Sequence, residues 1–193
     1  MNEAARNGVA GLAGIAALDA VRTARHWPVP LLAALDWPAH LATAGLVLAA
    51  LPRRLDPRMA AWALAGSVAI DLDHIPLYLG FRAAVTEGGR PVTHSLTTAA
   101  ALLGAAVASR GRLRTALAGL GEGVLLHFVR DIATGPGLPL LWPVRSRNVR
   151  IPYGMHLAAL GLTVAVAALR RPVPRRGRLP RQRDGGGTSR SGG

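Results

Sequence analysis

The chain contains no cysteine, which excludes disulfide bridges, thiolate zinc sites and cysteine nucleophiles. Aromatic residues make up only 4% of the 193 residues, so the hydrophobic half of the composition is mainly alanine, leucine and valine. Acidic residues are also scarce, with 10 of them against 23 basic residues, every one of which is arginine. The length is sufficient for one domain with a sizeable core.

The excess of arginine first suggests a nucleic-acid partner. A net charge of +13 and a pI near 11.9 are typical of proteins that bind nucleic acids. Here, however, the arginines lie in short runs between apolar segments, which is more typical of a membrane protein. A soluble nucleic-acid binder would leave these apolar segments unexplained. We therefore expect membrane lipids, and not nucleic acid, as partners.

Arginine runs separate five apolar windows, which are residues 37–51, 59–81, 91–109, 115–129 and 151–169. A helix that crosses a bilayer needs about 20 residues, and three of the windows approach or exceed that length. The fourth window is the weakest candidate because it holds Glu122 between two glycines. The pattern predicts an all-α, multi-pass membrane protein with about five transmembrane helices.

The ends of the chain differ from this central region of residues 37–170. Residues 1–36 are expected to form an interfacial helix or an additional span. They do not resemble a secretory signal peptide, because Asp19 and Arg22 leave no clean cleavage site after the apolar stretch. Residues 171–193 are rich in proline, arginine, glycine and serine, and are expected to form a disordered basic tail.

The arginine runs also predict an orientation. If five helices alternate in direction, the runs after the first, third and last windows fall on one side, which the positive-inside rule makes cytoplasmic. The loop with Arg145, Arg147 and Arg150 departs from the rule, because it falls on the opposite side. The same alternation places the acidic and histidine residues of the windows at the opposite, outer end.

Three short polar clusters interrupt the apolar windows, namely Asp71-Leu72-Asp73-His74, Thr93-His94-Ser95 and His127-Phe128-Val129-Arg130-Asp131. Carboxylates and imidazoles cost several kcal/mol in apolar surroundings unless a partner or a metal compensates them. His127 and Asp131 are four residues apart and share one face of a helix. Pro76 is expected to end the preceding helix near Ile75, which would free Asp73 to join the same site. Because this energetic cost recurs at three separate points of the sequence, we predict that the three clusters form one shared site.

Nitrogen and oxygen ligands without sulfur suit zinc, manganese, iron or magnesium, and the histidine content favours a transition metal. Several carboxylates leave room for two ions. Each of these residues, taken alone, also has a simpler interpretation. The pair of His127 and Asp131 could be an ordinary helix-surface pair, and His94 could stand at a helix start beside the capping candidates Thr93 and Ser95. His156 is interpreted as an interfacial residue.

The ordered set resembles the YdjM-like family of membrane-bound, metal-dependent hydrolases. The resemblance covers residues 37–170 and rests on His40, Asp71-Leu72-Asp73-His74, Arg90-Pro91-Val92-Thr93-His94-Ser95, His127-x-x-x-Asp131, Thr134, Gly135 and Pro143. It implies a multi-pass inner-membrane protein, distantly similar to zinc-dependent phospholipase C and to zinc-dependent nucleases. Zinc is then the first choice of metal, as one or two ions, with manganese or iron as alternatives.

The resemblance implies a metal-ligand set of His40, Asp71, Asp73, His74, His94, His127 and Asp131. It also implies that Arg90 and Thr93 contact the substrate or orient His94. At position 89 the family often has histidine, whereas this chain has Gly89, so this position supplies no ligand here.

Together these features predict a hydrolase in which a metal-activated water attacks a phosphoester or a lipid-type ester, with Arg90 stabilising the developing negative charge. The alternative is a transporter or ion-relay protein that uses the buried acids and histidines. Against it, the clusters lie near the ends of the windows and not in their middle. A third interpretation is a structural membrane protein whose polar residues hold helices together.

Overall fold

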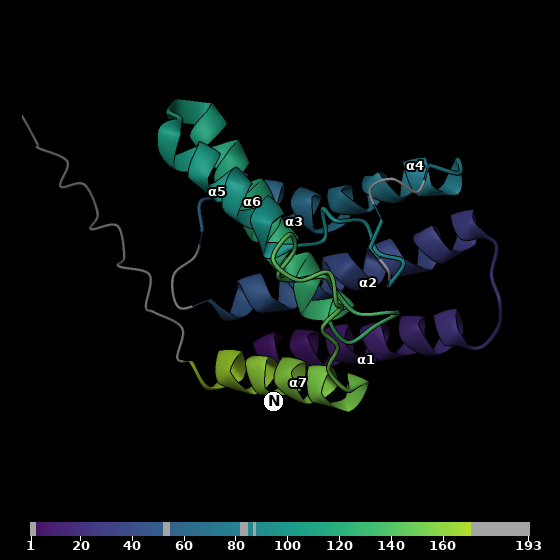
Figure 1. Cartoon of the computed structure of the whole chain (residues 1–193). Coiled ribbons are helices and arrows are strands. Elements are labelled where there is room, and N and C mark those ends of the chain that lie inside the picture. The colour runs from purple at the N-terminus through teal and green to yellow at the C-terminus, as the bar shows by residue number, and fades with distance from the viewer. Residues whose placement is uncertain (1–2, 52–54, 82–84, 87, 171–193) are drawn as a thin grey trace, which may run out of the picture.

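The computed structural model describes residues 3–51, 55–81, 85–86 and 88–170, and these residues form an arrangement of α-helices (Figure 1). The helices are α1 (Glu3–Thr23), α2 (Val29–Ala50), α3 (Pro57–Ala69), the 3-10 helix η1 (Ile70–Asp73), α4 (His74–Tyr78), α5 (Leu96–Ala108), α6 (Gly111–Asp131) and α7 (Tyr153–Leu169). Within the described ranges, β structure is limited to two isolated bridges. The predicted all-α class is therefore confirmed, while the predicted basic tail, residues 171–193, lies outside the described residues.

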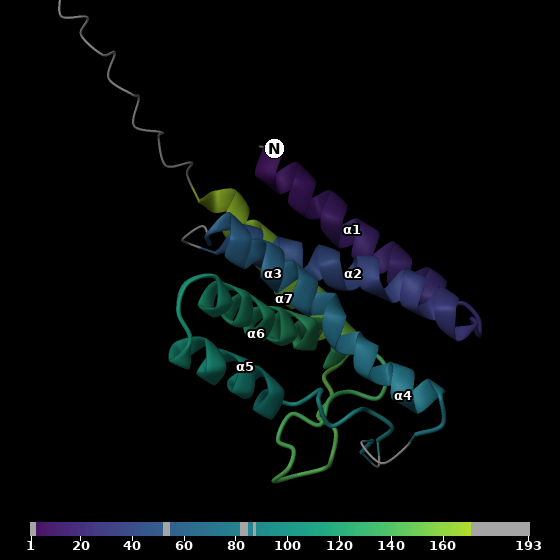
Figure 2. The same ribbon diagram turned by 90° about the horizontal axis from the view of Figure 1, so that it is seen from above.

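Helices α2 and α6 connect the two sides of the arrangement. Helix α6 packs against α3, α5 and α2, while α2 also packs against α3 and, on the other side, against α1 and α7 (Figure 2). The N-terminal residues that the sequence set apart thus form a 21-residue helix that lies against the rest of the protein. The predicted boundary after residue 36 falls inside α2, which is 22 residues long.

Glycines allow α3 and α6 to approach closely. A Cβ atom added to Gly123 of α6 would lie 2.7 Å from the Cα atom of Gly66 in α3. A Cβ atom added to Gly119, one turn earlier, would lie 2.7 Å from the carbonyl oxygen of Met59. These distances are below any ordinary contact, so only glycine fits at these positions. The close contact fixes the end of α3 beside the last turns of α6.

The predicted number of about five spans is not confirmed. Among the described residues, only one helix, Pro30–Ala50 within α2, is long and apolar enough to cross a membrane by length and hydropathy. Helices α5 and α7 are apolar but have only 13 and 17 residues. In two windows the helix is shorter than the apolar window that predicted it. The 3-10 helix η1 divides residues 59–81, and in residues 91–109 helix α5 begins only at Leu96.

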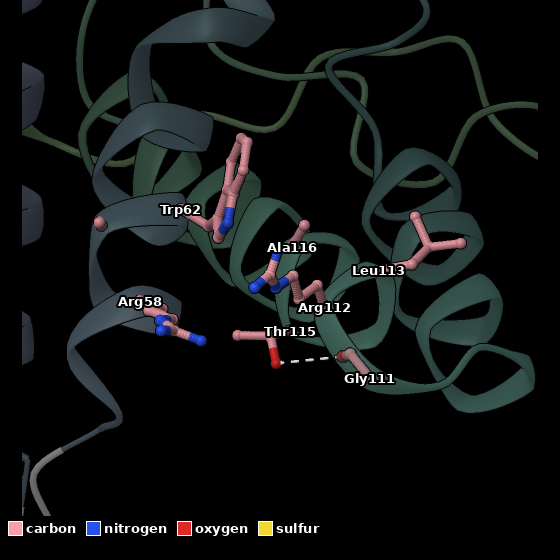
Figure 3. Close-up of a pocket in the computed structure, with 8 residues that line it drawn as sticks. Arg58, Trp62, Gly111, Arg112, Leu113, Thr115 and Ala116 are labelled. Atoms are coloured by element: carbon pink, nitrogen blue, oxygen red, sulfur yellow. Dashed lines mark hydrogen bonds between the residues drawn. The ribbon is translucent and has the colours of Figure 1, made fainter.

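Arginines at the end of α5 and at the starts of α3 and α6 lie at one end of the helices, as does Arg170 after α7. Arg58 and Arg112 line a groove of about 920 Å³ with Trp62, between the first turns of α3 and α6 (Figure 3). Arg170 donates a hydrogen bond to the carbonyl of Ala50, which brings the end of α7 to the end of α2. The loop that carries Arg145 follows the last turn of α6, at the opposite end.

The contact between α3 and α6 can be tested with a pair of glycine substitutions. Gly123→Ala places a methyl group against the backbone of α3, and we expect it to lower the free energy of unfolding by about 1–3 kcal/mol. Gly104→Ala on α5 is the matched control, because a Cβ atom there meets nothing within 4 Å. Thermal unfolding in detergent, followed by circular dichroism, measures both. Equal stabilities of the two variants would contradict the close helix contact.

Candidate metal centre

The structure brings together all seven residues that the sequence analysis named as metal ligands. They come from four segments of the chain, which are α2, η1 with the start of α4, the loop before α5, and the last turns of α6. Their ligand atoms form three overlapping groups, each with all atoms within 4.8 Å of one another, namely His40, His127 and Asp131; Asp71, His94 and His127; and Asp73, His74 and His94. One polar centre thus lies where these segments meet.

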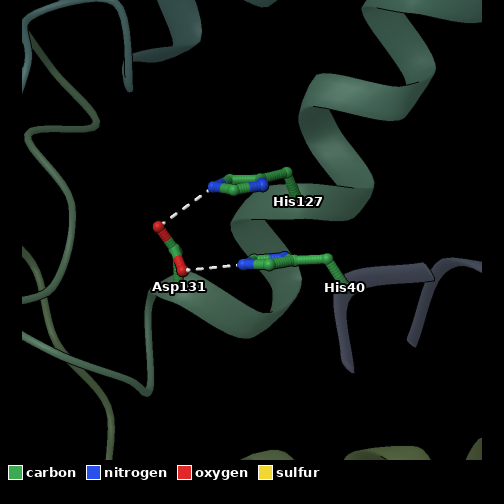
Figure 4. Close-up of side chains that lie close together, drawn as sticks. All are labelled: His40, His127 and Asp131. Atoms are coloured by element: carbon green, nitrogen blue, oxygen red, sulfur yellow. Dashed lines mark hydrogen bonds and ion pairs between the residues drawn. The ribbon is translucent and has the colours of Figure 1, made fainter. Parts of the chain in front are cut away.

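Asp131 connects two stacked imidazoles (Figure 4). The rings of His40 and His127 are parallel within 5°, with centroids 3.9 Å apart. His127 Nε2 lies 3.0 Å from Asp131 Oδ2, and His40 Nε2 lies 3.3 Å from Asp131 Oδ1. The three side chains are buried. The four-residue spacing in α6 therefore serves a buried site and not a helix surface.

The orientation of His127 is set by α3. Its Nδ1 atom lies 2.8 Å from the backbone carbonyl oxygen of Ser67. Because a carbonyl oxygen can only accept a hydrogen bond, Nδ1 carries a hydrogen, and Nε2 is the nitrogen that faces the centre and Asp131. This arrangement is typical of histidines that ligate metals, whose second nitrogen is held by a backbone or carboxylate oxygen.

His94 has a free ligand atom. Its Nδ1 lies 3.1 Å from Asp73 Oδ2, whereas its buried Nε2 has no hydrogen-bond partner among the described residues. This Nε2 lies 3.7 Å from Asp71 Oδ1 and 3.8 Å from Asp131 Oδ2. Zinc bonds of about 2.0–2.1 Å place tetrahedral ligand atoms about 3.3 Å apart. The donor spacing and the unpartnered nitrogen thus fit a shared divalent ion.

The 3-10 helix η1 explains how the second cluster reaches the centre. Residues three apart are eclipsed in a 3-10 helix, and His74 Nδ1 accordingly lies 3.8 Å from Asp71 Oδ1. The same nitrogen lies 2.9 Å from Asp73 Oδ1. The expected helix end near Ile75 was wrong in position, since α3 ends at Ala69 and α4 continues through Pro76. Pro76 is tolerated because it stands near the start of this short helix.

Neighbouring side chains shift the pKa values of Asp73 and His94. Burial alone would raise the pKa of Asp73, but hydrogen bonds from His74, His94 and Thr93 hold the pKa of that carboxyl well below its usual range. Burial would likewise lower the pKa of His94, but the neighbouring carboxylates of Asp71 and Asp73 raise it. Asp73 is therefore a carboxylate at neutral pH and a strong acceptor for its neighbours.

Arg90 and Thr93 contact the carboxylates of the centre. Arg90 Nη1 lies 2.8 Å from Asp131 Oδ2, and its Nε donates to the carbonyl oxygen of Gly137 at 3.2 Å. Gly135, with φ +59°, allows this approach, since a Cβ atom there would lie 3.3 Å from Arg90 Nη2. Thr93 donates to Asp73, the residue that holds His94. Thr93 thus acts on His94 through Asp73.

The charges of the centre leave a negative excess. Three carboxylates, those of Asp71, Asp73 and Asp131, face one guanidinium, that of Arg90, which sums to −2 when the histidines are neutral. A buried excess of this size is costly unless a cation compensates it. The charge of the centre therefore suits a divalent cation, and its nitrogen and oxygen donors suit zinc better than calcium or magnesium.

A neighbouring ion-pair network was not found from the sequence. Arg130 is fully buried and pairs with Asp19 of α1 and Asp36 of α2, while Asp19 accepts a hydrogen bond of 2.7 Å from the Tyr153 hydroxyl. Arg130 Nη1 also lies 3.3 Å from His40 Nε2. The available signal was the presence of single acids inside the apolar sequence of α1 and α2, each of which needs a partner.

His156 lies outside the three ligand groups. Its interpretation as an interfacial residue was wrong, because the side chain is buried, with its ring 5.9 Å from that of Tyr153.

With this geometry described, the chain can be compared with known proteins. The family model described as YdjM inner membrane protein matches residues 35–186. The chain belongs to the YdjM family. No curated protein and no solved structure matches it. The family resemblance seen in the sequence is thus confirmed, and so is the inner-membrane location. Helix α1 precedes the region shared with the YdjM family, although its Asp19 pairs with Arg130 inside that region.

The network predicts that α1 is needed for stability. Asp19→Ala leaves the buried Arg130 with one acid fewer and removes the acceptor of Tyr153, and we expect a loss of about 3 kcal/mol in the free energy of unfolding. Glu3→Ala, an exposed acid at the start of the same helix, is the control and is expected to have little effect. Chemical unfolding in detergent micelles compares them. Wild-type stability of Asp19→Ala would refute the role of the network.

Proposed function

We propose that this YdjM-family protein is a metal-dependent hydrolase that cleaves a phosphoester or another lipid-type ester at the outer surface of the inner membrane. The observation that carries the proposal is the convergence of four histidines and three aspartates around the unpartnered Nε2 of His94. Such an arrangement is expensive to maintain without a ligand, and clusters of perturbed titratable groups are typical of functional sites.

The inner ligands of a divalent ion, zinc first and manganese or iron as alternatives, would be Asp71, His94, His127 and Asp131. His40 would complete the inner set, and Asp73 with His74 would hold a second ion or orient His94. When bound, such an ion supplies an activated water at neutral pH and neutralises charge on the leaving oxygen.

The protein side chains prepare the site for this chemistry. Ser67 and Asp73 fix the directions of His127 and His94, so that both Nε2 atoms face the reacting region. Arg90 holds Asp131 and places a positive charge beside the position of a phosphoryl group, where it can stabilise negative charge that develops during reaction. In the hydrolysis the water oxygen bonds to phosphorus, the ester P–O bond breaks, and a water proton passes to the leaving alcohol.

The proposal includes several membrane spans, with membrane lipids as partners. Large apolar side chains on α5 and α7 point outwards, such as Val107, Leu162 and Leu169, which are 67–83% exposed. In a bilayer these side chains would meet lipid, where their exposure costs little. The arginines at one end and the metal centre at the other are consistent with about five spans whose basic ends are cytoplasmic.

Metal analysis tests the proposal. Wild-type protein purified in detergent without chelator is expected to hold at least one equivalent of a divalent transition metal. His127→Ala and Asp131→Ala are expected to lose it, together with metal-dependent hydrolysis of a panel of soluble phosphoesters. His156→Ala is the control, because this histidine is also buried but lies outside the ligand groups.

Two results would contradict the proposal. One is a failure of the metal analysis, that is, a metal content well below one equivalent in wild type or a content in His127→Ala and Asp131→Ala that equals that of wild type. The other is a bound metal without hydrolysis of any ester, combined with cation uptake into proteoliposomes, which would favour the transporter alternative.

A further inference from the structure

A cleft of about 330 Å³ connects the metal centre with the surface. Its polar floor is formed by Asp71, His74 and Arg90, which belong to the centre, together with Arg22 from the end of α1 and Asp36 of α2. Its walls come from the first half of α2 and from η1 with α4. Any substrate that reaches the centre through this cleft therefore passes between these two walls.

The walls of the cleft are apolar. Trp37 of α2 faces the cleft from one side, and Leu72, Ile75 and Tyr78 line it from the other. These four side chains are 39–57% exposed, so they present apolar surface at the mouth and are not covered by the protein itself. Apolar surface that leads directly to polar groups in a cleft is typical of a ligand-binding groove.

The polar floor of the cleft carries positively charged groups that can bind an anionic head group. Arg22 Nε forms an ion pair with Asp36 at 3.4 Å but no hydrogen bond among the described residues, so its guanidinium can also bind an anion. Arg22 and Arg90 thus bring two guanidinium groups to the cleft, and guanidinium is well suited to phosphate oxygens. The cleft therefore combines anion recognition inside with apolar contact at its mouth.

The volume limits what the cleft can hold. Sites that enclose a complete small molecule measure about 300–1,000 Å³, so this cleft has room for a head group but not for a long acyl chain as well. A chain attached to a bound head group must leave through the mouth, over Trp37 and Ile75. A water-soluble phosphoester would leave that apolar surface unused.

We propose that the substrate is a phosphoester-containing membrane lipid, whose phosphate lies between Arg22 and Arg90 and whose hydrocarbon chain crosses the apolar mouth of the cleft. This proposal rests on the hydrolase function proposed above and specifies its substrate class. Trp37, Leu72, Ile75 and Tyr78 are then the residues that select for a long chain.

The test compares two phosphatidic acids with the same head group, one with hexanoyl and one with oleoyl chains, presented to the full chain in detergent micelles. Release of phosphate is expected to be faster for the oleoyl lipid, and Trp37→Ala is expected to reduce the ratio of the two kcat/KM values about fivefold. Trp62→Ala is the matched control, since Trp62 is similarly exposed, at 45% against 39% for Trp37, but lines the arginine groove at the other end (Figure 3).

A binding measurement with a lipid analogue that cannot be hydrolysed separates this proposal from the hydrolase function. A fluorescently labelled phosphonate analogue of oleoyl phosphatidic acid, which cannot be hydrolysed, is expected to bind the protein purified without chelator, more weakly after Trp37→Ala or Arg22→Gln and unchanged after Trp62→Ala. Hydrolysis of both lipids at equal rates, with Trp37→Ala like wild type, would overturn the lipid proposal while the hydrolase function stands. Binding with the expected variant pattern but no hydrolysis of any phosphoester would support the lipid site and refute the hydrolase.

Discussion

The structure depends on the compensation of three buried or half-buried carboxylates by imidazoles and one guanidinium. Asp71, Asp73 and Asp131 come from two segments far apart in the sequence, and their mutual repulsion would separate η1 from the end of α6. Arg90 and the histidines oppose this repulsion but leave an excess of negative charge. A divalent ion would remove the excess and bind η1 to α6, so that metal binding and folding support one another.

The scaffold positions these charges with rigid contacts. Gly66 and Gly123 bring α3 and α6 together, so the carbonyl of Ser67 can reach His127. Next to this contact, Arg130 connects α6 to Asp19 of α1 and to Asp36 of α2. The network is neutral when Arg22 is included, so it does not compete with the metal centre for a cation. It instead fixes the helix that carries His40.

The residues of the centre could be predicted because acids and histidines are rare in apolar sequence and stand out there. Their spacing in α6 also predicted the shared face of His127 and Asp131. The early end of α3 could not be predicted, because the 3-10 turn at Ile70–Asp73 is stabilised by contacts with distant residues such as His94. For the same reason the pairing of Asp19 with Arg130 was missed, since 111 residues separate them. Window length also overestimated helix length, because the first residues of the third window, 91–95, lie in a loop.

X-ray absorption spectroscopy of the purified protein tests the central claim most directly, because it reports the ligands of a bound metal. We expect nitrogen and oxygen neighbours at about 2.0–2.1 Å, with the outer scattering of at least two imidazoles and no sulfur. His94→Ala is expected to remove one of these imidazoles. A metal surrounded only by oxygen, without imidazole scattering, or a spectrum that His94→Ala leaves unchanged, would contradict a metal held by the histidines and aspartates of this centre.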